Sequence, residues 1–242
     1  MAAVLLALVH VAALLPTGAT VVETTILPSG VSADRMLVIW VLGIRRECPP
    51  GWRDGWGCWD NTRGCHYQGP TRVSLVDTKG SRIINTLSIA SSWTGEDAFE
   101  LPYEVRAGGP YRSGGRFGRP RLLELKDYNG DGVAAEFALY QTITCSDLLS
   151  SLIGYSQKQD RVIQYPIQVT FETYDHQVPS STTNWAELLF ATAPVAPGRW
   201  RFAEDHPGSY TNLAAHIHVE NEVWYRPATE AFEMTSVESE RE

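Results

Sequence analysis

The stretch LLELKDYNGDGVAAEFALY, Leu122–Tyr140, carries the strongest structural pattern in this chain of 242 residues. Apolar and polar residues alternate before its centre, where Leu123 and Leu125 are separated by Glu124. After the centre, from Phe137 onward, larger side chains again alternate with others. Alternation is typical of β-strands, and the Asn-Gly and Asp-Gly pairs between the two runs are strong turn signals. The stretch therefore predicts a strand, a loop and a second strand.

The central run Asp127–Gly132 places oxygen-bearing side chains at alternate positions, followed by the glycine that a tight loop needs. Ca²⁺ takes roughly six to eight oxygen ligands, which a short loop supplies from alternate side chains, one backbone carbonyl and a later carboxylate. The predicted ligands are the side chains of Asp127, Asn129, Asp131 and Glu136 and the carbonyl of Val133. A metal-free hairpin turn rich in Asn and Asp is the alternative. An EF-hand is disfavoured, because Ala138 stands where that loop requires Glu.

In its flanks and its spacing, Leu122–Tyr140 resembles the FG-GAP or VCBS type of repeat found in β-propellers, whose calcium loop D-x-[DN]-x-D-G-x-x-D lies between two strands. The resemblance implies ligands at Asp127, Asn129 and Asp131. Its closing Asp would fall on Ala135, so Glu136 would take that role one residue later. The signature occurs once, whereas a propeller repeats it in each blade, so the resemblance covers the loop and not a propeller fold.

The first nineteen residues, Met1–Ala19, contain no Asp, Glu, Lys or Arg and end in small residues that suit a signal peptidase. We therefore expect a signal peptide at residues 1–19 and a secreted or periplasmic mature chain. An apolar N-terminal strand or an uncleaved anchor is the alternative. No later segment has the roughly 20 apolar residues of a membrane helix. The stretches Gly69–Thr78 and Leu152–Ile167 together resemble secreted bacterial proteins to which no activity is assigned.

Residues 20–242 suit one β-rich domain, because short runs rich in Val, Ile, Tyr and Thr alternate with Gly, Pro, Asn and Asp. The fold class expected is all-β, as a single antiparallel sandwich or an irregular barrel-like domain. The expected strands are Val21–Leu27, Met36–Leu42, Arg72–Asp77, Ile83–Ile89, Phe99–Val105, Leu122–Lys126, Ala135–Ile143, Ser151–Tyr155, Val162–Tyr174, Glu187–Ala191, Arg199–Ala203, Ala214–Val219, Glu222–Arg226 and Ala231–Thr235. One helical turn is expected at Ser146–Ser151.

The even number of cysteines fits two disulfides in an exported chain. The candidates are Cys48, Cys58, Cys65 and Cys145. If all four pair internally, every connectivity joins Cys145 to the segment Cys48–Gly69; zinc is the less favoured alternative. Three indoles in that segment, Trp52, Trp56 and Trp59, would stack on sugar rings or cover the core. A second irregular stretch, Arg106–Pro120, is rich in Gly and Arg and is expected to be a solvated loop.

No motif in the sequence points to a catalytic nucleophile or a zinc protease. His216 and His218 are two apart in an expected strand, so they would share one face as a metal pair or as solvated polar residues. A formal net charge of −8 argues against nucleic acid as a partner. The leading hypothesis is an exported, non-enzymatic β-protein with one structural Ca²⁺ and an unidentified protein or glycan partner. The alternative is a secreted carbohydrate-active enzyme or sugar-binding module that uses the three indoles.

Overall fold

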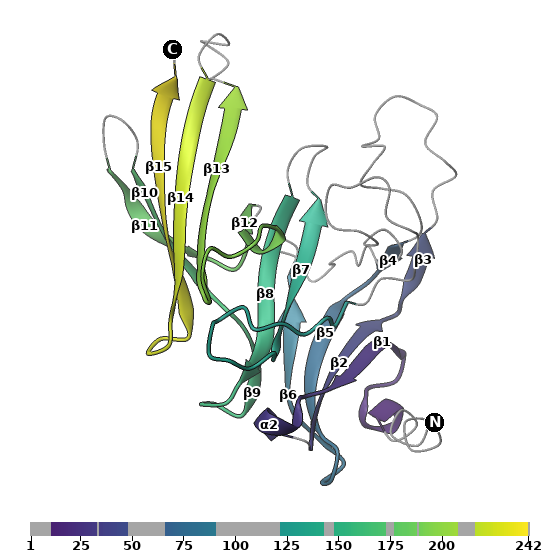
Figure 1. Ribbon diagram of the computed structural model, residues 1–242. Helices are drawn as coiled ribbons and strands as arrows, with labels where there is room; N and C mark the ends of the chain where they lie inside the picture. Colours follow the sequence, from purple (N-terminus) through teal and green to yellow (C-terminus); the bar gives the residue numbers. More distant parts are fainter. Residues whose placement is uncertain are drawn as a thin grey trace.

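The computed structural model describes residues 11–32, 34–47, 66–90, 122–142, 148–172, 177–187, 189–207 and 216–241. These residues form three mostly antiparallel sheets and one short ribbon, and none of the three sheets closes into a barrel in the described part of the chain (Figure 1). Helical structure there is confined to single turns, such as α2 (Ser29–Ser32) and the 3-10 turn η1 (Leu189–Ala191). The all-β expectation is confirmed.

The first sheet contains four antiparallel strands in the order β1-β2-β5-β6. Its strands are β1 (Ala19–Ile26), β2 (Arg35–Leu42), β5 (Thr71–Asp77) and β6 (Arg82–Ile89). The sequence predicted three of these, β2, β5 and β6, to within one residue at each end. Between β2 and β5 in the chain, β3 (Arg45–Glu47) and β4 (His66–Gln68) pair with each other as a short antiparallel ribbon.

The middle sheet has the order β12-β8-β7, and β9 pairs with β8. Its strands are β7 (Glu136–Thr142), β8 (Leu148–Ser156), β9 (Arg161–Gln164) and β12 (Ala186–Glu187). The third sheet has the order β11-β10-β15-β14-β13, in which only the β10–β15 pair is parallel among the described strands. Its strands are β10 (Ile167–Glu172), β11 (Gln177–Thr183), β13 (Arg199–Pro207), β14 (His216–Arg226) and β15 (Ala231–Arg241).

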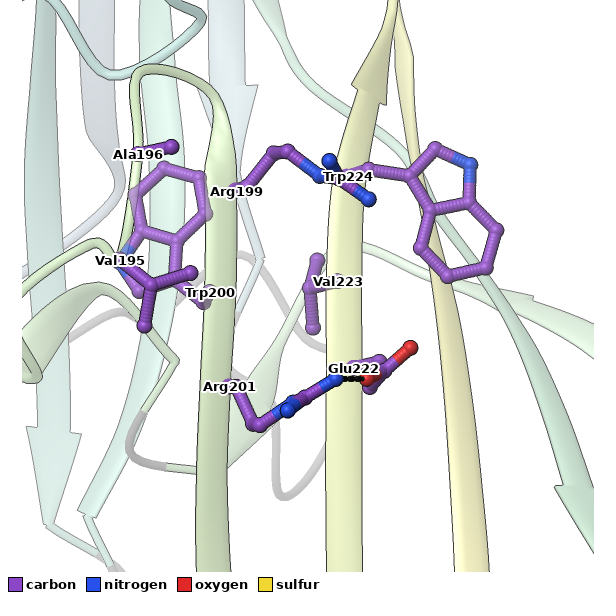
Figure 2. Close-up of a pocket in the computed structure, with 8 residues that line it drawn as sticks. All are labelled: Val195, Ala196, Arg199, Trp200, Arg201, Glu222, Val223 and Trp224. Atoms are coloured by element: carbon purple, nitrogen blue, oxygen red, sulfur yellow. Dashed lines mark hydrogen bonds and ion pairs between the residues drawn. The ribbon is translucent and has the colours of Figure 1, made fainter.

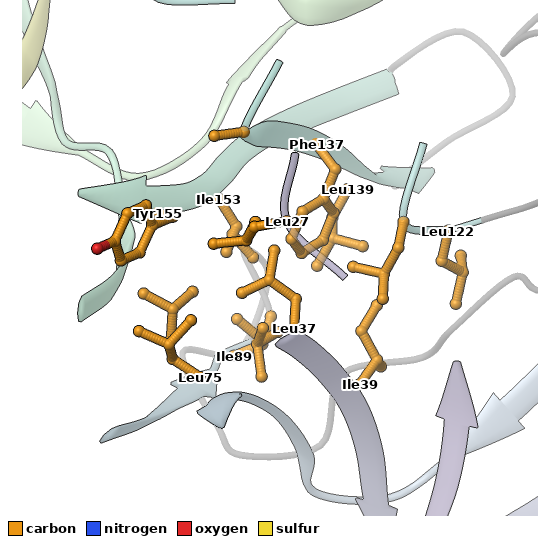
Figure 3. Close-up of a cluster of buried hydrophobic side chains, with 14 of the residues drawn as sticks. Leu27, Leu37, Ile39, Leu75, Ile89, Leu122, Phe137, Leu139, Ile153 and Tyr155 are labelled. Atoms are coloured by element: carbon orange, nitrogen blue, oxygen red, sulfur yellow. The ribbon is translucent and has the colours of Figure 1, made fainter. Parts of the chain in front are cut away.

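The middle sheet is buried on both faces. Phe137 and Leu139 of β7 lie in one apolar core with Leu37 of the first sheet (Figure 3). Ala138 of the same strand lies in a second core with Phe232 of the third sheet. Because successive side chains of a strand point to opposite faces, β7 contributes to both cores at once. The layers therefore run first sheet, middle sheet, third sheet, as Figure 1 also shows.

Strand β2 is also buried on both faces, which explains its unbroken apolar sequence MLVIWVL. Its inner face belongs to the first core, and its outer face carries Met36, Val38 and Trp40. Part of the expected signal peptide lies on this outer face: Val11 is only 3% exposed. Strand β1 begins at Ala19, the last residue of that expected segment.

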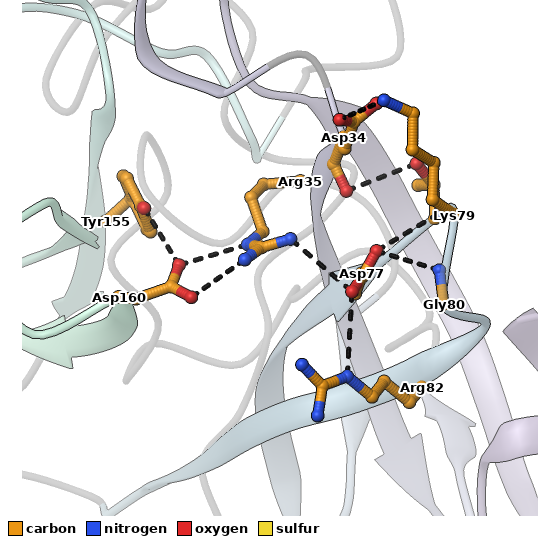
Figure 4. A network of polar contacts seen from close by, with 9 residues as sticks. Asp34, Arg35, Asp77, Lys79, Gly80, Arg82, Tyr155 and Asp160 are labelled. Carbon is orange, nitrogen blue, oxygen red and sulfur yellow. Dashed lines mark hydrogen bonds and ion pairs between the residues drawn. The ribbon is translucent and has the colours of Figure 1, made fainter.

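A polar network ties the first sheet to the turn between β8 and β9 (Figure 4). Arg35 donates two hydrogen bonds to the Asp160 carboxylate, at 3.0 and 2.8 Å, and lies 3.6 Å from Asp77. The Tyr155 hydroxyl donates to the same carboxylate at 2.8 Å. The hydrogen bonds from Arg35 hold the pKa of Asp160 below its usual value. The geometry is the two-pronged contact that guanidinium and carboxylate groups favour.

The expected strand Leu122–Lys126 is wrong. Only Lys126 pairs, through reciprocal backbone hydrogen bonds with Glu136 of 2.8 and 3.2 Å. The backbone N–H groups of Leu122 and Leu123 instead donate to the Glu23 carboxylate, at 2.7 and 3.3 Å. Both leucines are buried, which a strand with one solvated face does not allow for two successive residues.

Several further elements differ from the expectation, and β13 and β15 run to Pro207 and Arg241, beyond their expected ends. The expected strand Val162–Tyr174 is interrupted at Pro166, which lacks a backbone N–H, so the chain passes there from β9 to β10. The second half of Glu187–Ala191 forms η1, and β8 occupies Leu148–Ser151 in place of the expected helical turn. The two strands expected on either side of Glu220-Asn221 are one continuous strand, β14.

Several expectations fall on segments outside the described residues. These are Met1–His10, the strand Phe99–Val105, the loop Arg106–Pro120, the four cysteines, and Trp52, Trp56 and Trp59. Within the described ranges, no helix is both long and apolar enough to cross a membrane.

Candidate metal centre

The loop between Lys126 and β7 folds around the carboxylate of Asp127. One of its oxygens accepts the backbone N–H groups of Gly130 and Asp131, at 2.8 and 3.1 Å, and the other accepts that of Gly132 at 2.9 Å. Gly130 and Gly132 have φ angles of 77° and 87°, a conformation that costs glycine little and other residues more. The sequence Asn-Gly-Asp-Gly thus lets three successive N–H groups face one carboxylate.

Three of the other side chains predicted as ligands lie against one another. The Asn129 amide nitrogen donates to an oxygen of Asp131 at 3.2 Å and to an oxygen of Glu136 at 3.1 Å. The Asn129 oxygen accepts the backbone N–H of Asp131 at 2.9 Å. Asp131 also accepts the backbone N–H of Val133 at 2.8 Å. One amide nitrogen therefore occupies the position between two carboxylates where a positive charge is most favourable.

Glu136 is the most unusual residue of the group, because its carboxyl group is fully buried at 0% exposure. One oxygen accepts the Tyr128 backbone N–H at 3.1 Å and the other accepts from Asn129. Burial, together with the charges of Asp131 and Asp127, raises the pKa of Glu136 to about 8. Within the described part of the chain, no Lys, Arg or His forms an ion pair with it. A buried carboxylate without a cation is costly, so a proton or a metal ion has to compensate the charge.

A glycine on the neighbouring strand makes room for Glu136. Gly154 of β8 lies directly across from Glu136 in the antiparallel register. A Cβ atom at position 154 would lie 2.7 Å from the Glu136 Cγ atom and 2.9 Å from the Ala135 carbonyl oxygen. Such distances are shorter than carbon atoms tolerate, so only glycine fits here without a shift of the loop or of β7.

The loop is fixed from the other side by the third sheet. The Tyr128 ring stacks on Trp200, with centroids 6.5 Å apart, and meets the edge of Phe190 at 5.8 Å. The Gly130 backbone packs against the turn before β13, where an added Cβ would lie 2.6 Å from the Pro197 carbonyl carbon. Tyr165 is buried beside the site, and burial with the nearby charge of Glu136 raises its pKa. The loop therefore contacts both cores.

The arrangement has the oxygen donors of a hard-cation site, but not in coordinating positions. Among the described residues, no three His, Cys, Asp or Glu side chains are grouped closely enough to hold a metal as they stand. Asp127 directs its oxygens at backbone N–H groups, and the Val133 carbonyl accepts the N–H of Ala135 at 3.0 Å. Coordination would require the Asn129 amide to turn its oxygen toward Asp131 and Glu136. The same rotation would break the two hydrogen bonds that the Asn129 amide nitrogen donates to Asp131 and Glu136.

The histidine pair predicted from the sequence lies on β14. His218 lies on β14, and its ring is 2.7 Å from the Asp205 carboxylate and 3.7 Å from that of Glu220. It is only 8% exposed, so the expectation of polar residues on a solvated strand face does not hold for this residue. The His216 side chain is outside the described atoms.

Sequence patterns missed a second buried carboxylate. Glu230, which is 8% exposed, accepts hydrogen bonds from the Ser156 hydroxyl and, at 2.7 Å, from the Gln159 amide. More than seventy residues separate the partners along the chain, so no local motif could reveal the contact.

Comparison of the chain with protein-family models, curated protein sequences and solved structures gives no match.

Proposed function

We propose that the chain is an exported, non-enzymatic β-protein in which one Ca²⁺ joins the Asp127–Glu136 loop to the two cores. The proposed ligands are Asp127, Asn129, Asp131, the Val133 carbonyl and Glu136. The observation that carries the proposal is Glu136, a fully buried carboxylate that accepts a hydrogen bond from Asn129 and has no cationic side chain paired to it among the described residues. Three carboxyl groups within ten residues provide the charge that a divalent cation neutralises.

Calcium suits this donor set better than other biological cations. All the donors are oxygens, which hard cations prefer, and the set mixes carboxylates, an amide and a backbone carbonyl. Calcium accepts irregular coordination at about 2.3–2.6 Å, whereas Mg²⁺ requires near-octahedral geometry at about 2.0–2.1 Å. A loop whose carboxylates approach from different directions fits the larger ion. An extracellular site needs only weak affinity, roughly 10⁻⁴–10⁻³ M.

The position of the loop favours a structural role over a catalytic one. Tyr128 packs in the second core, and Leu123 and Ala135, on either side of it, are buried in the first. Glu136 is fully enclosed, which leaves no access for a substrate. An ion bound here would fix the loop relative to both cores and would stabilise the folded state by binding it in preference to the unfolded chain.

Thermal unfolding of Asp131→Ala in CaCl₂ and in EDTA tests the proposal. We expect a lower melting temperature than wild type in calcium and a small difference in EDTA. Glu124→Ala, an acidic residue three positions before the loop with a 67% exposed side chain, is the matched control and should respond to calcium as the wild type does. Equal losses for Asp131→Ala in both conditions would assign the residue to the turn and not to a metal. Calorimetric titration should give one Ca²⁺ per chain.

A further inference from the structure

The outer face of β13 and β14 contains a hollow that the calcium site does not use. Its volume is about 300 Å³, and it is lined mainly by side chains of these two strands (Figure 2). Two cross-strand pairs form its walls: Arg199 lies opposite Trp224, and Arg201 lies opposite Glu222. Val195, which precedes β13 and is 67% exposed, forms an apolar rim. The volume is at the lower end of the range for small-molecule sites.

The hollow carries an uncompensated positive charge. Arg201 forms an ion pair with Glu222, so these two charges cancel. Arg199 has no acidic partner among the described residues, although the whole chain has a net charge of −8. A guanidinium group presents parallel N–H donors that match both oxygens of a carboxylate. The charge and the geometry of Arg199 therefore suit a carboxylate ligand.

The indole beside Arg199 is held in place by its own contacts. The Trp224 ring nitrogen donates to Glu233 at 2.9 Å, and the Arg226 guanidinium lies 5.3 Å from the ring centroid. Arg226 also pairs with Glu233 at 2.8 Å. A ring fixed in this way offers apolar contact area with little loss of side-chain entropy on binding. A ligand in the hollow would meet a preformed apolar wall next to a free guanidinium.

We propose that this hollow binds a uronic acid residue of a glycan. The carboxylate would accept two hydrogen bonds from Arg199, and the C–H face of the sugar ring would lie against Trp224. A neutral sugar offers the apolar face without the charge, and benzoate offers the charge and a flat ring without the hydroxyl groups of a sugar. The hollow is outside the Asp127–Glu136 loop, so this inference goes beyond the calcium proposal and does not rest on it.

Binding of a galacturonate trimer, measured by calorimetry and by saturation-transfer NMR, tests the inference. The neutral galactose trimer and benzoate are the comparison ligands. We expect the galacturonate trimer to bind, the neutral trimer to show no measurable binding, and Arg199→Gln to weaken the galacturonate complex by about tenfold or more, the effect of losing hydrogen bonds to a charged group. Arg199→Lys should give an intermediate loss, because it keeps the charge and loses the two-pronged geometry.

Arg161→Gln on β9, another exposed arginine, is the matched control and should bind as the wild type does. Arg199 is exposed, so its substitution should leave the melting temperature unchanged. Absence of galacturonate binding, equal binding of the neutral trimer, or unchanged binding by Arg199→Gln would overturn the proposal. Benzoate binding at equal strength would overturn the assignment to a glycan. None of these outcomes bears on calcium, which is read from unfolding in EDTA.

Discussion

The negative charge of the buried Glu136 can be compensated by a proton or by a calcium ion, and substitution of Glu136 by Gln distinguishes the two. Burial raises the pKa of Glu136 to about 8 from an ordinary value of 4.5. Without calcium at pH 7, the folded protein therefore holds a proton on Glu136 that the unfolded chain has released. The free energy involved is roughly 3–4 kcal/mol, since about 2.5 pH units each contribute about 1.4 kcal/mol. Gln mimics the neutral acid and avoids this cost.

We therefore expect Glu136→Gln to be about 1–3 kcal/mol more stable than wild type in EDTA at pH 7. The folded wild type binds more protons than the unfolded chain between pH 4.5 and about 8, so its stability in EDTA falls as pH rises through that window. The variant lacks this fall, and the two proteins converge near pH 4.5. In calcium at about 100 times the dissociation constant, wild type should gain about 2.7 kcal/mol. The variant should gain much less, because it lacks one of the proposed ligands.

Urea unfolding at several pH values, in EDTA and in CaCl₂, measures these differences. Glu124→Gln is the control, because this side chain is 67% exposed and pairs with Lys126 at 3.3 Å. The reasoning is refuted if Glu136→Gln is less stable than wild type in EDTA at pH 7, or if both proteins gain equally from calcium. The first result would mean that the carboxylate is ionised and compensated by a group of the protein itself.

Three further predictions concern the surroundings of this site and the first sheet. Gly154→Ala should cost about 1–3 kcal/mol of stability by forcing Glu136 out of place, whereas Gly30→Ala, which has open space around it, should be neutral in the same urea titration. Asp160→Asn should lower stability by under about 1 kcal/mol at neutral pH, because this carboxylate is partly exposed; the lowered pKa of Asp160 means that the difference disappears as pH falls below the folded-state value. A chain that starts at Thr20 should bind more of a hydrophobic dye than the full chain, because the outer face of β2 loses its cover; equal binding would show that residues 11–18 do not protect it.

Local patterns of apolar and polar residues were sufficient to predict the bounds of three strands in the first sheet. The ends of β2, β5 and β6 fall at changes from apolar runs to polar turns, so their boundaries were predictable from composition. The unbroken run of β2 also signals burial on both faces, but nothing in it reveals that Val11 lies on the outer face. The prediction of a strand at Leu122–Lys126 is wrong, because the first backbone N–H groups of this segment bind the Glu23 side chain and not another strand.

Local spacing predicted which side chains of the loop lie together better than it predicted their setting. Asn129, Asp131 and Glu136, which the spacing grouped, are in hydrogen-bond contact, whereas Asp127 accepts backbone N–H groups of its own loop. The close packing of Glu136 depends on Gly154 across the sheet, and the packing of Gly130 depends on the turn before β13. Neither partner is close in sequence. The hollow at Arg199 depends on strand register, which pairs residues about twenty positions apart. Such contacts arise from the fold and leave no local motif.

The place of Glu136 in the fold links the calcium proposal to export. The loop packs between two cores, so a charge left uncompensated there opposes the closure of both core layers. A site with affinity in the extracellular range of roughly 10⁻⁴–10⁻³ M is empty at the low calcium concentration of a cytosol. At neutral pH the chain then has to take up a proton on Glu136 in order to fold, at the free-energy cost estimated above. Outside the cell, the proposed calcium ion would compensate the charge instead. The same carboxylate would thus keep the chain less stable before export and stabilise it after arrival, and the pH and calcium dependence of Glu136→Gln measures both halves of that difference.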